Sequence, residues 1–205
     1  MFEGRDLTCV RGERVLFAGL DFRLDAGDAC LVTGRNGSGK SSLLRLMAGL
    51  LTPFEGEILW HGVPVAEDRE DFSAAMHYVG HLDAVKPVLT VAENLTFWAK
   101  LRGGSGIGAG LDAFDLEDLR DLPGRMLSAG QKRRVALARL LVAPAPLWLL
   151  DEPTVALDTE SVRAVERAVA IHRAAGGLAV ISSNVPIDLP GAIELPVAHP
   201  DVAPA

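Results

Sequence analysis

Hydrophobic positions in the first fifty residues follow two different periods. Short apolar stretches at residues 4–9 and 15–24 are typical of strands, and the continuous apolar run ACLVTG at 29–34 predicts a strand that is buried on both faces. The next apolar positions recur at helical spacing, at Leu43, Leu44, Met47 and Leu50. Three strands and a helix are therefore expected, with a glycine-rich break at residues 37–39 before the helix.

The rest of the chain alternates strand patterns with helix patterns. Strands are predicted at 55–62, 75–80, 146–152, 177–183 and 192–195. Helices are predicted at 89–102, where Thr90 and Glu93 can form a capping box, after residue 128, and at 159–174. Residues 103–110, GGSGIGAG, lack periodicity and predict a flexible connector. This order predicts an α/β fold with a mainly parallel sheet, an N-terminal antiparallel β part and a helical insertion at about residues 81–130.

Length, charge and cysteine content restrict the function classes. A chain of 205 residues with 49% hydrophobic residues favours one globular domain spanning residues 1–205. The net charge of −7 and the pI near 5.2 argue against a broad nucleic-acid-binding surface, so no nucleic acid partner is expected. Cys9 and Cys30 lie in apolar segments and are expected to be reduced core residues.

The sequence also lacks the features of a membrane-spanning or secreted chain. The best apolar run, LLVAPAPLWLL, is interrupted by Pro144 and Pro146 and is shorter than the roughly 20 residues that span a bilayer. The first residues, MFEGRDLTCV, lack the charged and apolar regions of a secretory signal, so a cytoplasmic location is expected. The Pro- and Ala-rich residues 196–205 are expected to fray.

The segment GRNGSGKS at residues 34–41 matches the pattern GxxxxGK[ST], after a predicted buried strand and at the start of a predicted helix. Its backbone N–H groups can surround phosphate oxygens, and glycine permits this close approach. Lys40 can reach the β- and γ-phosphates, and Ser41 can offer its hydroxyl to Mg²⁺. The candidate ATP-binding residues here are Gly34, Arg35, Asn36, Gly37, Ser38, Gly39, Lys40, Ser41 and Ser42.

Two adjacent carboxylates end the apolar strand LWLLDE. Asp151 is predicted to lie near the Mg²⁺, through a water molecule, and Glu152 is predicted to polarise the attacking water. A solvated acidic strand end is the alternative for such a pair in isolation, but the phosphate-binding loop in the same chain favours the catalytic interpretation. ATP and Mg²⁺ are therefore the predicted cofactors.

A second glycine motif, LSAGQ, precedes a basic helix; alone, it is consistent with a helix N-cap. In sequence with the phosphate-binding loop, WLLDEP and the ALD at 156–158, it resembles the nucleotide-binding domain of ABC transporters, over essentially the whole chain. The resemblance implies a P-loop NTPase fold of the ABC type and pairing with a second copy of the chain. It also implies that the signature acts on the partner's ATP and that Asp158 belongs to a dimer loop; the signature residues are Leu127, Ser128, Ala129, Gly130 and Gln131.

The physics of a helix start agrees with that role for the signature. A helix N-terminus with free N–H groups attracts anions, and Ser128 and Gly130 keep it open. The basic residues that follow are predicted to form a solvated face: Lys132, Arg133, Arg134 and Arg139.

Finer features narrow the resemblance. His81 stands where most ABC domains carry a glutamine that senses magnesium and couples to the membrane subunit; a loop histidine without a role is the alternative. With KPVLTVAENL at 86–95, LTCVRGERVLF at 7–17 and LSAGQKRRVALARL, it resembles the ATP-binding subunits of the heme exporter in cytochrome c maturation. That resemblance implies membrane permease partners of the CcmB and CcmC type, a peripheral place on the cytoplasmic face of the inner membrane, and heme delivery without direct heme ligation by this chain.

Two positions depart from the family pattern. Asn184 stands where the family usually has a histidine that contacts the γ-phosphate, and asparagine cannot become cationic, so slow turnover or a demand for tight dimer closure is expected. Arg11 stands near the usual adenine-stacking aromatic residue; it can stack its guanidinium on the base or lie exposed to solvent.

The cargo and the docking surface stay open at this stage. Leu95, Trp98 and Leu101 of the helical insertion are candidates to receive a membrane subunit, although such residues are more often core. An ABC exporter of a lipid, drug or polysaccharide shares the same ATP chemistry. A soluble ABC ATPase acting on DNA or ribosomes is disfavoured, because such proteins need a coiled-coil arm or two linked ATPase domains.

Overall fold

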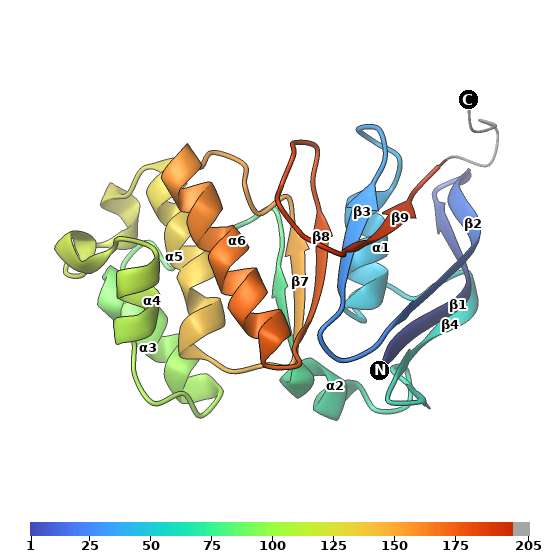
Figure 1. Ribbon diagram of the computed structural model, residues 1–205, viewed down its shortest axis with the longest axis horizontal. Coiled ribbons are helices and arrows are strands. Elements are labelled where there is room, and N and C mark those ends of the chain that lie inside the picture. The colour runs from blue at the N-terminus through green and yellow to red at the C-terminus, as the bar shows by residue number, and fades with distance from the viewer. Residues whose placement is uncertain (199–205) are drawn as a thin grey trace.

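The computed structural model describes residues 1–198, which form two sheets and a lobe of helices arranged in a row (Figure 1). The antiparallel sheet lies at one end, the parallel sheet in the middle and the helical lobe at the other end. The N-terminus lies on the side of the antiparallel sheet. The fold confirms the predicted α/β class with an N-terminal antiparallel part.

The antiparallel sheet has the strand order β2-β1-β4-β5. Its strands are β1 (Phe2–Arg11), β2 (Arg14–Leu24), β4 (Glu55–Trp60) and β5 (Val63–Pro64). Register shifts along β1 mark bulges, which bend this sheet. One consequence is that β2 reaches the phosphate-binding loop, where Leu16 and Phe17 lie against Gly39.

The parallel sheet has the strand order β6-β7-β8-β3-β9. Its strands are β3 (Ala29–Thr33), β6 (Met76–Val79), β7 (Leu147–Asp151), β8 (Leu178–Ser182) and β9 (Ile193–Pro196). Because all neighbouring strands are parallel, their carboxyl ends share one edge. That edge carries the phosphate-binding loop after β3, the residues around His81 after β6, the carboxylates after β7 and Asn184 after β8.

Side chains of the parallel strands alternate between two hydrophobic cores. On β7, Trp148 and Leu150 enter the core shared with the helical lobe and α6, whereas Leu147 and Leu149 enter the core shared with α1 and the antiparallel sheet. The same alternation on β8 sends Ile181 to the first core and Val180 to the second. The continuous apolar runs of the sequence are thus explained by a sheet that is covered on both faces.

Six α-helices surround the sheets within the described residues: α1 (Lys40–Met47), α2 (Arg69–Ala75), α3 (Val91–Leu101), α4 (Gly108–Ala113), α5 (Ala129–Val142) and α6 (Thr159–Ala174). The helical lobe contains α3 and α4, which pack on α5, and short 3₁₀ turns at Glu117–Leu119 and Gly124–Met126. No helix of residues 1–198 is long and apolar enough to cross a membrane.

Several sequence expectations are confirmed, and others are wrong. The helix at 159–174 and the capping box of Thr90 and Glu93 are found as predicted. The expected connector at 103–110 is wrong in its last three residues, because α4 begins at Gly108. Val197 is buried and its N–H bonds the Thr33 carbonyl, so the expected frayed tail does not begin at residue 196; residues 199–205 lie outside the described part.

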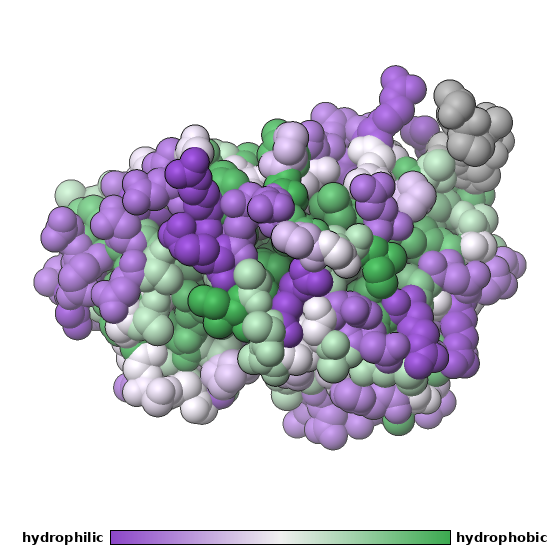
Figure 2. Space-filling model, viewed as in Figure 1, coloured by the Kyte–Doolittle hydropathy of each residue, from purple (hydrophilic) through white to green (hydrophobic). Residues whose placement is uncertain are grey.

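The cysteines and the surface agree with the composition. Cys9 and Cys30 are buried free thiols, as expected, and burial raises the pKa of Cys30 to about 12. On the face shown in Figure 2, hydrophilic residues predominate at both ends of the molecule, and hydrophobic residues show mainly near its middle.

Candidate functional site

The phosphate-binding loop joins β3 to α1 and has a backbone that only glycine adopts easily. Gly34, Gly37 and Gly39 have φ values of 145°, 79° and 110°. A Cβ on Gly34 would lie 2.5 Å from the Val197 carbonyl oxygen, so the loop has no room for a side chain there. Gly39 is the N-cap of α1 and gives no side-chain cap, which leaves N–H groups of the first turn open to an anion.

Lys40 lies at the centre of this edge and is largely buried. Its Nζ donates to the carbonyl oxygens of Gly34 at 2.9 Å and Arg35 at 3.4 Å, and to Asn184 Oδ1 at 2.8 Å. The same Nζ lies 4.0 Å from Glu152 Oε1. Lys40 therefore already lies beside both the loop and the predicted catalytic carboxylate.

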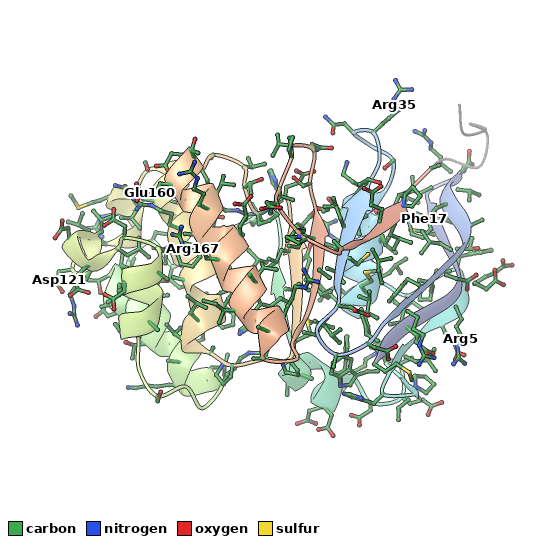
Figure 3. All side chains as sticks on the ribbon, viewed as in Figure 1. Arg5, Phe17, Arg35, Asp121, Glu160 and Arg167 are labelled. Carbon is green, nitrogen blue, oxygen red and sulfur yellow. The ribbon has the colours of Figure 1, made fainter. Side chains whose placement is uncertain are left out.

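The other predicted ATP-binding residues lie on or near the loop. Arg35 and Asn36 are exposed at its tip, where Figure 3 shows Arg35 pointing away from the protein. Ser38 Oγ is buried without a hydrogen-bond partner among the described residues. Since buried hydroxyls normally form a hydrogen bond, this oxygen is available to a bound ligand. Arg11 is exposed at the end of β1, in the sheet whose β2 contacts the loop.

Asp151 offers an oxygen that suits a hard cation. Its carboxylate is 1% exposed, and Oδ1 accepts from Ser41 Oγ at 3.0 Å and Ser182 Oγ at 2.7 Å. The other oxygen, Oδ2, is buried without a partner within residues 1–198. Carboxylate and hydroxyl oxygens are ligands that Mg²⁺ prefers, with water and substrate phosphates completing its shell. The residues present therefore fit magnesium, although these same residues include no cluster of three or more acidic, histidine or cysteine ligands.

Glu152 is held in an unusual conformation next to that carboxylate. Its backbone φ is +50°, a left-handed value that residues other than glycine rarely adopt. Its N–H bonds both the carbonyl and the hydroxyl of Ser182, at 3.1 and 3.0 Å. Its carboxylate accepts from the backbone N and from Nδ2 of Asn184, at 3.0 and 2.5 Å. Asn184 thus bridges Lys40 and Glu152.

His81 lies at the same edge of the sheet, two residues beyond β6. Val79 of β6 pairs with Leu150 of β7, so the chain leaves the sheet beside the two carboxylates. The His81 side chain is exposed. His81 therefore follows the strand next to β7, at the sheet edge that carries the phosphate-binding loop and the two carboxylates.

The signature forms the start of α5. Ser128 is its N-cap in a capping box: Ser128 Oγ accepts from Gln131 N at 3.2 Å, and Gln131 Oε1 accepts from Ser128 N at 2.8 Å. Gly130 is required at its position, because a Cβ would lie 2.7 Å from the Ala156 carbonyl oxygen. The signature shares a concave site of about 300 Å³ with the start of α6, lined by Ser128, Gly130, Gln131, Arg134, Ala156, Leu157, Asp158 and Ser161.

Asp158 therefore lies with the signature rather than with the phosphate-binding loop. It caps α6 by accepting from Ser161 N at 2.8 Å, and this hydrogen bond lowers the pKa of the Asp158 carboxyl. In Figure 1, α1 and α5 lie to opposite sides of β7, so the two glycine motifs of one chain do not meet.

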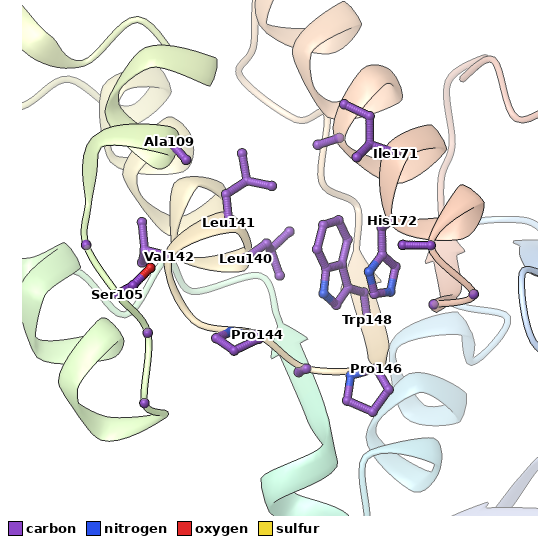
Figure 4. A pocket seen from close by; sticks show the side chains of 18 of the residues that line it. Ser105, Ala109, Leu140, Leu141, Val142, Pro144, Pro146, Trp148, Ile171 and His172 are labelled. Atoms are coloured by element: carbon purple, nitrogen blue, oxygen red, sulfur yellow. The ribbon is translucent and has the colours of Figure 1, made fainter.

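A larger cavity of about 810 Å³ lies elsewhere and lacks the predicted site residues. It opens beside the amino end of β7, between the end of α5, the glycine-rich residues 103–108 and α6 (Figure 4). Trp148 and His172 stack in its wall, with ring centroids 3.8 Å apart. Its walls bring no phosphate-binding groups together, so its size does not make it the nucleotide site.

The expected solvated basic face is wrong for two of its four residues. Arg133 and Arg139 are buried rather than solvated; Arg139 lies 4.7 Å above the Trp98 ring and donates to the Tyr78 carbonyl, and burial lowers its pKa to about 10. Arg134, predicted on the same face, is half-buried and donates to the carbonyl of Phe114.

The candidate docking residues divide in the same way. Leu95 is fully buried and Trp98 is packed beneath Arg139, so neither is an exposed docking residue. Leu101 is 61% exposed, as proposed from the sequence, and Phe97, which sequence reasoning missed, is 47% exposed.

Comparison with known proteins shows the family of this chain. The ABC transporter family model matches residues 17–155. The "Cytochrome c biogenesis ATP-binding export protein CcmA" of Rhodospirillum rubrum is 58% identical over 97% of this chain and 86% of its own length. The protein of the same name from Paramagnetospirillum magneticum is 58% identical over 95% of this chain and 92% of its own length.

Solved structures share the fold. A putative ABC transporter ATP-binding protein from Pyrococcus furiosus has a TM-score of 0.83 at 26% identity, covering 96% of both chains. The ATP-binding cassette MJ0796, solved as a dimer in a post-hydrolysis state with ADP and Pi, has a TM-score of 0.76 at 23% identity, covering 90% of this chain and 88% of the other. The chain therefore belongs to the ATP-binding subunits of the ABC transporter family, within the group of CcmA cytochrome c biogenesis ATP-binding export proteins.

Proposed function

We propose that this chain is the ATP-hydrolysing subunit of a heme exporter for c-type cytochrome biogenesis, and that it binds ATP with Mg²⁺ between two copies of itself. The observation that carries the proposal is the bridge from Lys40 through Asn184 to Glu152, which brings a phosphate-binding cation and a catalytic carboxylate to one edge. The names of the 58% identical relatives supply the process.

The phosphate-binding loop would hold the charge of the nucleotide. Lys40 would exchange its bonds to the Gly34 and Arg35 carbonyls for phosphate oxygens, and the open N–H groups of α1 would add to them. Magnesium, held by Ser41 and Asp151, would neutralise phosphate charge when bound. Arg11 would stack on the adenine from the end of β1.

Glu152 would act on the attacking water as a general base, oriented by Asn184 and by its own left-handed backbone. Asn184 carries no charge, so stabilisation of the transferred phosphate depends on Lys40 and on groups from the partner. His81 would report the state of this site to the membrane subunits.

The partner would complete the site with its signature. Ser128 Oγ accepts from Gln131 N, so its own O–H is free to donate to a phosphate oxygen. Gly130 and the start of α5 add a positive helix end. Asp158 lies in the same concave site and would contact the other copy as the dimer closes.

The membrane partners would be permease subunits of the CcmB and CcmC type, which would hold the chain at the cytoplasmic face of the inner membrane. Phe97 and Leu101 of α3 are the exposed apolar residues that would contact them. The chain would drive heme delivery without ligating heme itself.

Hydrolysis by the purified chain, with its co-purified membrane subunits, tests the proposal. Glu152→Gln should lower the rate by more than about 100-fold while ATP affinity changes little. Glu160→Gln, an exposed carboxylate in the first turn of α6, is the matched control and should keep the wild-type rate. Equal rates in both variants would overturn the assignment of Glu152.

The cargo is tested separately. Membranes that contain the wild-type complex should accumulate the absorbance of chaperone-bound heme when ATP is added, and membranes with the Glu152→Gln variant should not. Hydrolysis that responds to a lipid, drug or polysaccharide instead of heme would assign another exporter.

A further inference from the structure

Arg133 of α5 is a buried cation whose three guanidinium nitrogens all donate hydrogen bonds. It is 4% exposed, and Nε donates to the Pro153 carbonyl at 3.1 Å. Nη1 donates to the Gly80 carbonyl at 2.8 Å and to Asp83 Oδ1 at 3.1 Å. Nη2 donates to the carbonyls of Asp151 and Glu152, both at 2.8 Å. Five N–H donors thus meet five acceptors.

These acceptors come from two separate segments of the chain. One segment is residues 80–83, which follows β6 and contains His81. The other is residues 151–153, which begins at the last residue of β7 and contains Asp151 and Glu152. Arg133 itself lies five residues after Ser128, on the same helix. One side chain therefore joins the signature, the His81 segment and the catalytic segment.

The arrangement bears directly on the conformation of Glu152. A left-handed backbone persists only where its surroundings hold it. Ser182 holds the Glu152 N–H from β8, and Arg133 holds the Glu152 carbonyl from α5. Without Arg133, the peptide after Glu152 would lose this hydrogen bond and become free to rotate, which would move the carboxylate away from Asn184.

The chemistry requires arginine in particular. A planar guanidinium offers five donors in a fixed fork, whereas a lysine ammonium offers three donors around one atom. Asp83 supplies the negative charge that a buried cation needs. A lysine at position 133 would keep the charge but could not satisfy both segments at once.

We propose that Arg133 is a positioning residue that fixes the backbone of Glu152 and connects it to the signature helix and the His81 segment. The inference rests on the proposed role of Glu152. Arg133 thus keeps the Glu152 backbone in one fixed arrangement with the start of α5, whose Ser128 is proposed to face the partner's nucleotide.

Arg133→Lys in the full chain tests this inference. The kcat for ATP hydrolysis should fall at least about tenfold, with KM for ATP within about twofold of wild type, because the hydrogen bonds of Arg133 go to residues 80–83 and 151–153 rather than to the phosphate-binding loop. Arg139→Lys is the matched control: an equally buried arginine of the same helix, with contacts to Trp98 and Tyr78. It should lower the melting temperature similarly but keep kcat.

A double variant separates positioning from general destabilisation. If Arg133 acts through Glu152, adding Arg133→Lys to Glu152→Gln should lower the residual rate by less than about twofold, since the two effects overlap. A further tenfold loss would show an independent role and overturn the inference.

The remaining outcomes are also decisive. A folded Arg133→Lys variant with wild-type kcat, or with a kcat loss matched by Arg139→Lys, overturns the inference. If Arg133→Lys does not fold, Asp83→Asn removes the charged partner near the surface; it should lower kcat at least about threefold at unchanged KM, and a wild-type kcat overturns the inference. A wild-type chain without ATPase activity would instead refute the proposed function.

Discussion

Acid should destabilise this protein through one buried histidine, His77 of β6. Its side chain is 2% exposed, and Nε2 lies 2.6 Å from the Ala143 carbonyl oxygen, so Nε2 is the proton donor of a neutral ring. Burial lowers the pKa of His77 from 6.5 to about 4. Protonation therefore requires either a strongly acidic solution or unfolding.

The magnitude follows from the two pKa values. At pH values between these two pKa values, His77 binds a proton in the unfolded chain but not in the folded one. The contribution of the neutral ring to the free energy of unfolding is therefore complete above the unfolded pKa and is lost as the pH falls towards 4. From about pH 7 to about pH 5, His77 alone should lower the free energy of unfolding by about 2 kcal/mol. Burial also lowers the pKa of His172, which acts in the same direction.

Urea unfolding at these two pH values, followed by tryptophan fluorescence, measures the loss. His77→Gln keeps an N–H donor for the Ala143 carbonyl but does not titrate, so its loss between the two pH values should be smaller than the wild-type loss by about 2 kcal/mol. His81→Gln, which changes an exposed histidine, is the control and should behave as wild type. The same loss in wild type and His77→Gln would refute the reasoning.

Three further variants probe the nucleotide edge and the signature. Ser128→Arg should abolish hydrolysis but change ATP binding to the monomer less than about twofold, because we propose that the signature acts on the partner's nucleotide; equal loss of both contradicts this. Asn184→His should raise the ATPase rate of the assembled complex by about tenfold, and an unchanged rate shows that charge there is unimportant. Gly34→Ala should lower the free energy of unfolding by about 1–3 kcal/mol and weaken ATP binding, whereas Gly12→Ala, at positive φ but in open space, should cost less.

Elements with strong local signals were predictable from the sequence. The apolar positions of α6 recur at helical spacing along the whole helix, and Asp158, directly before it, is a typical N-cap residue. The β3 strand and the glycine loop follow from a buried run and three glycines that adopt positive φ. These features depend on residues that are neighbours in the chain, so their interactions can be inferred without knowledge of the fold.

Helices that depend on tertiary contacts were missed. In α2 only Phe72 is buried, so no apolar period marks the helix. In α4 the glycines are not a sign of flexibility: a Cβ on Gly110 would lie 2.7 Å from Val142 Cγ1, so glycine permits close packing of α4 on α5. The sequence shows the glycines but not the helix that lies against them.

Some residues of the candidate site could also be predicted from local sequence patterns, whereas others could not. Spacing alone identifies Lys40 and Ser41, and also the pair of carboxylates at the end of an apolar strand. Asn184 is 144 positions from Lys40, and the two meet because β8 lies between β3 and β7 in the sheet. No pattern of neighbouring residues indicates this strand order, so only the resemblance to ABC domains pointed to Asn184.

The burial of Arg133 shows why a basic run does not by itself mean a solvated face. Helix α5 packs against α3, α4, α6 and β6, so most of its circumference is interior and it has little surface to offer charged residues. A cation is stable there only if acceptors surround it, and the carbonyl groups beyond β6 and β7 supply them at the edge where the sheet ends. The hydrogen bonds that satisfy this buried charge connect α5 to the backbone of Asp151 and Glu152. We therefore propose that α5 contributes to two sites: its N-cap Ser128 to the partner's nucleotide, and Arg133 to the geometry of its own Glu152.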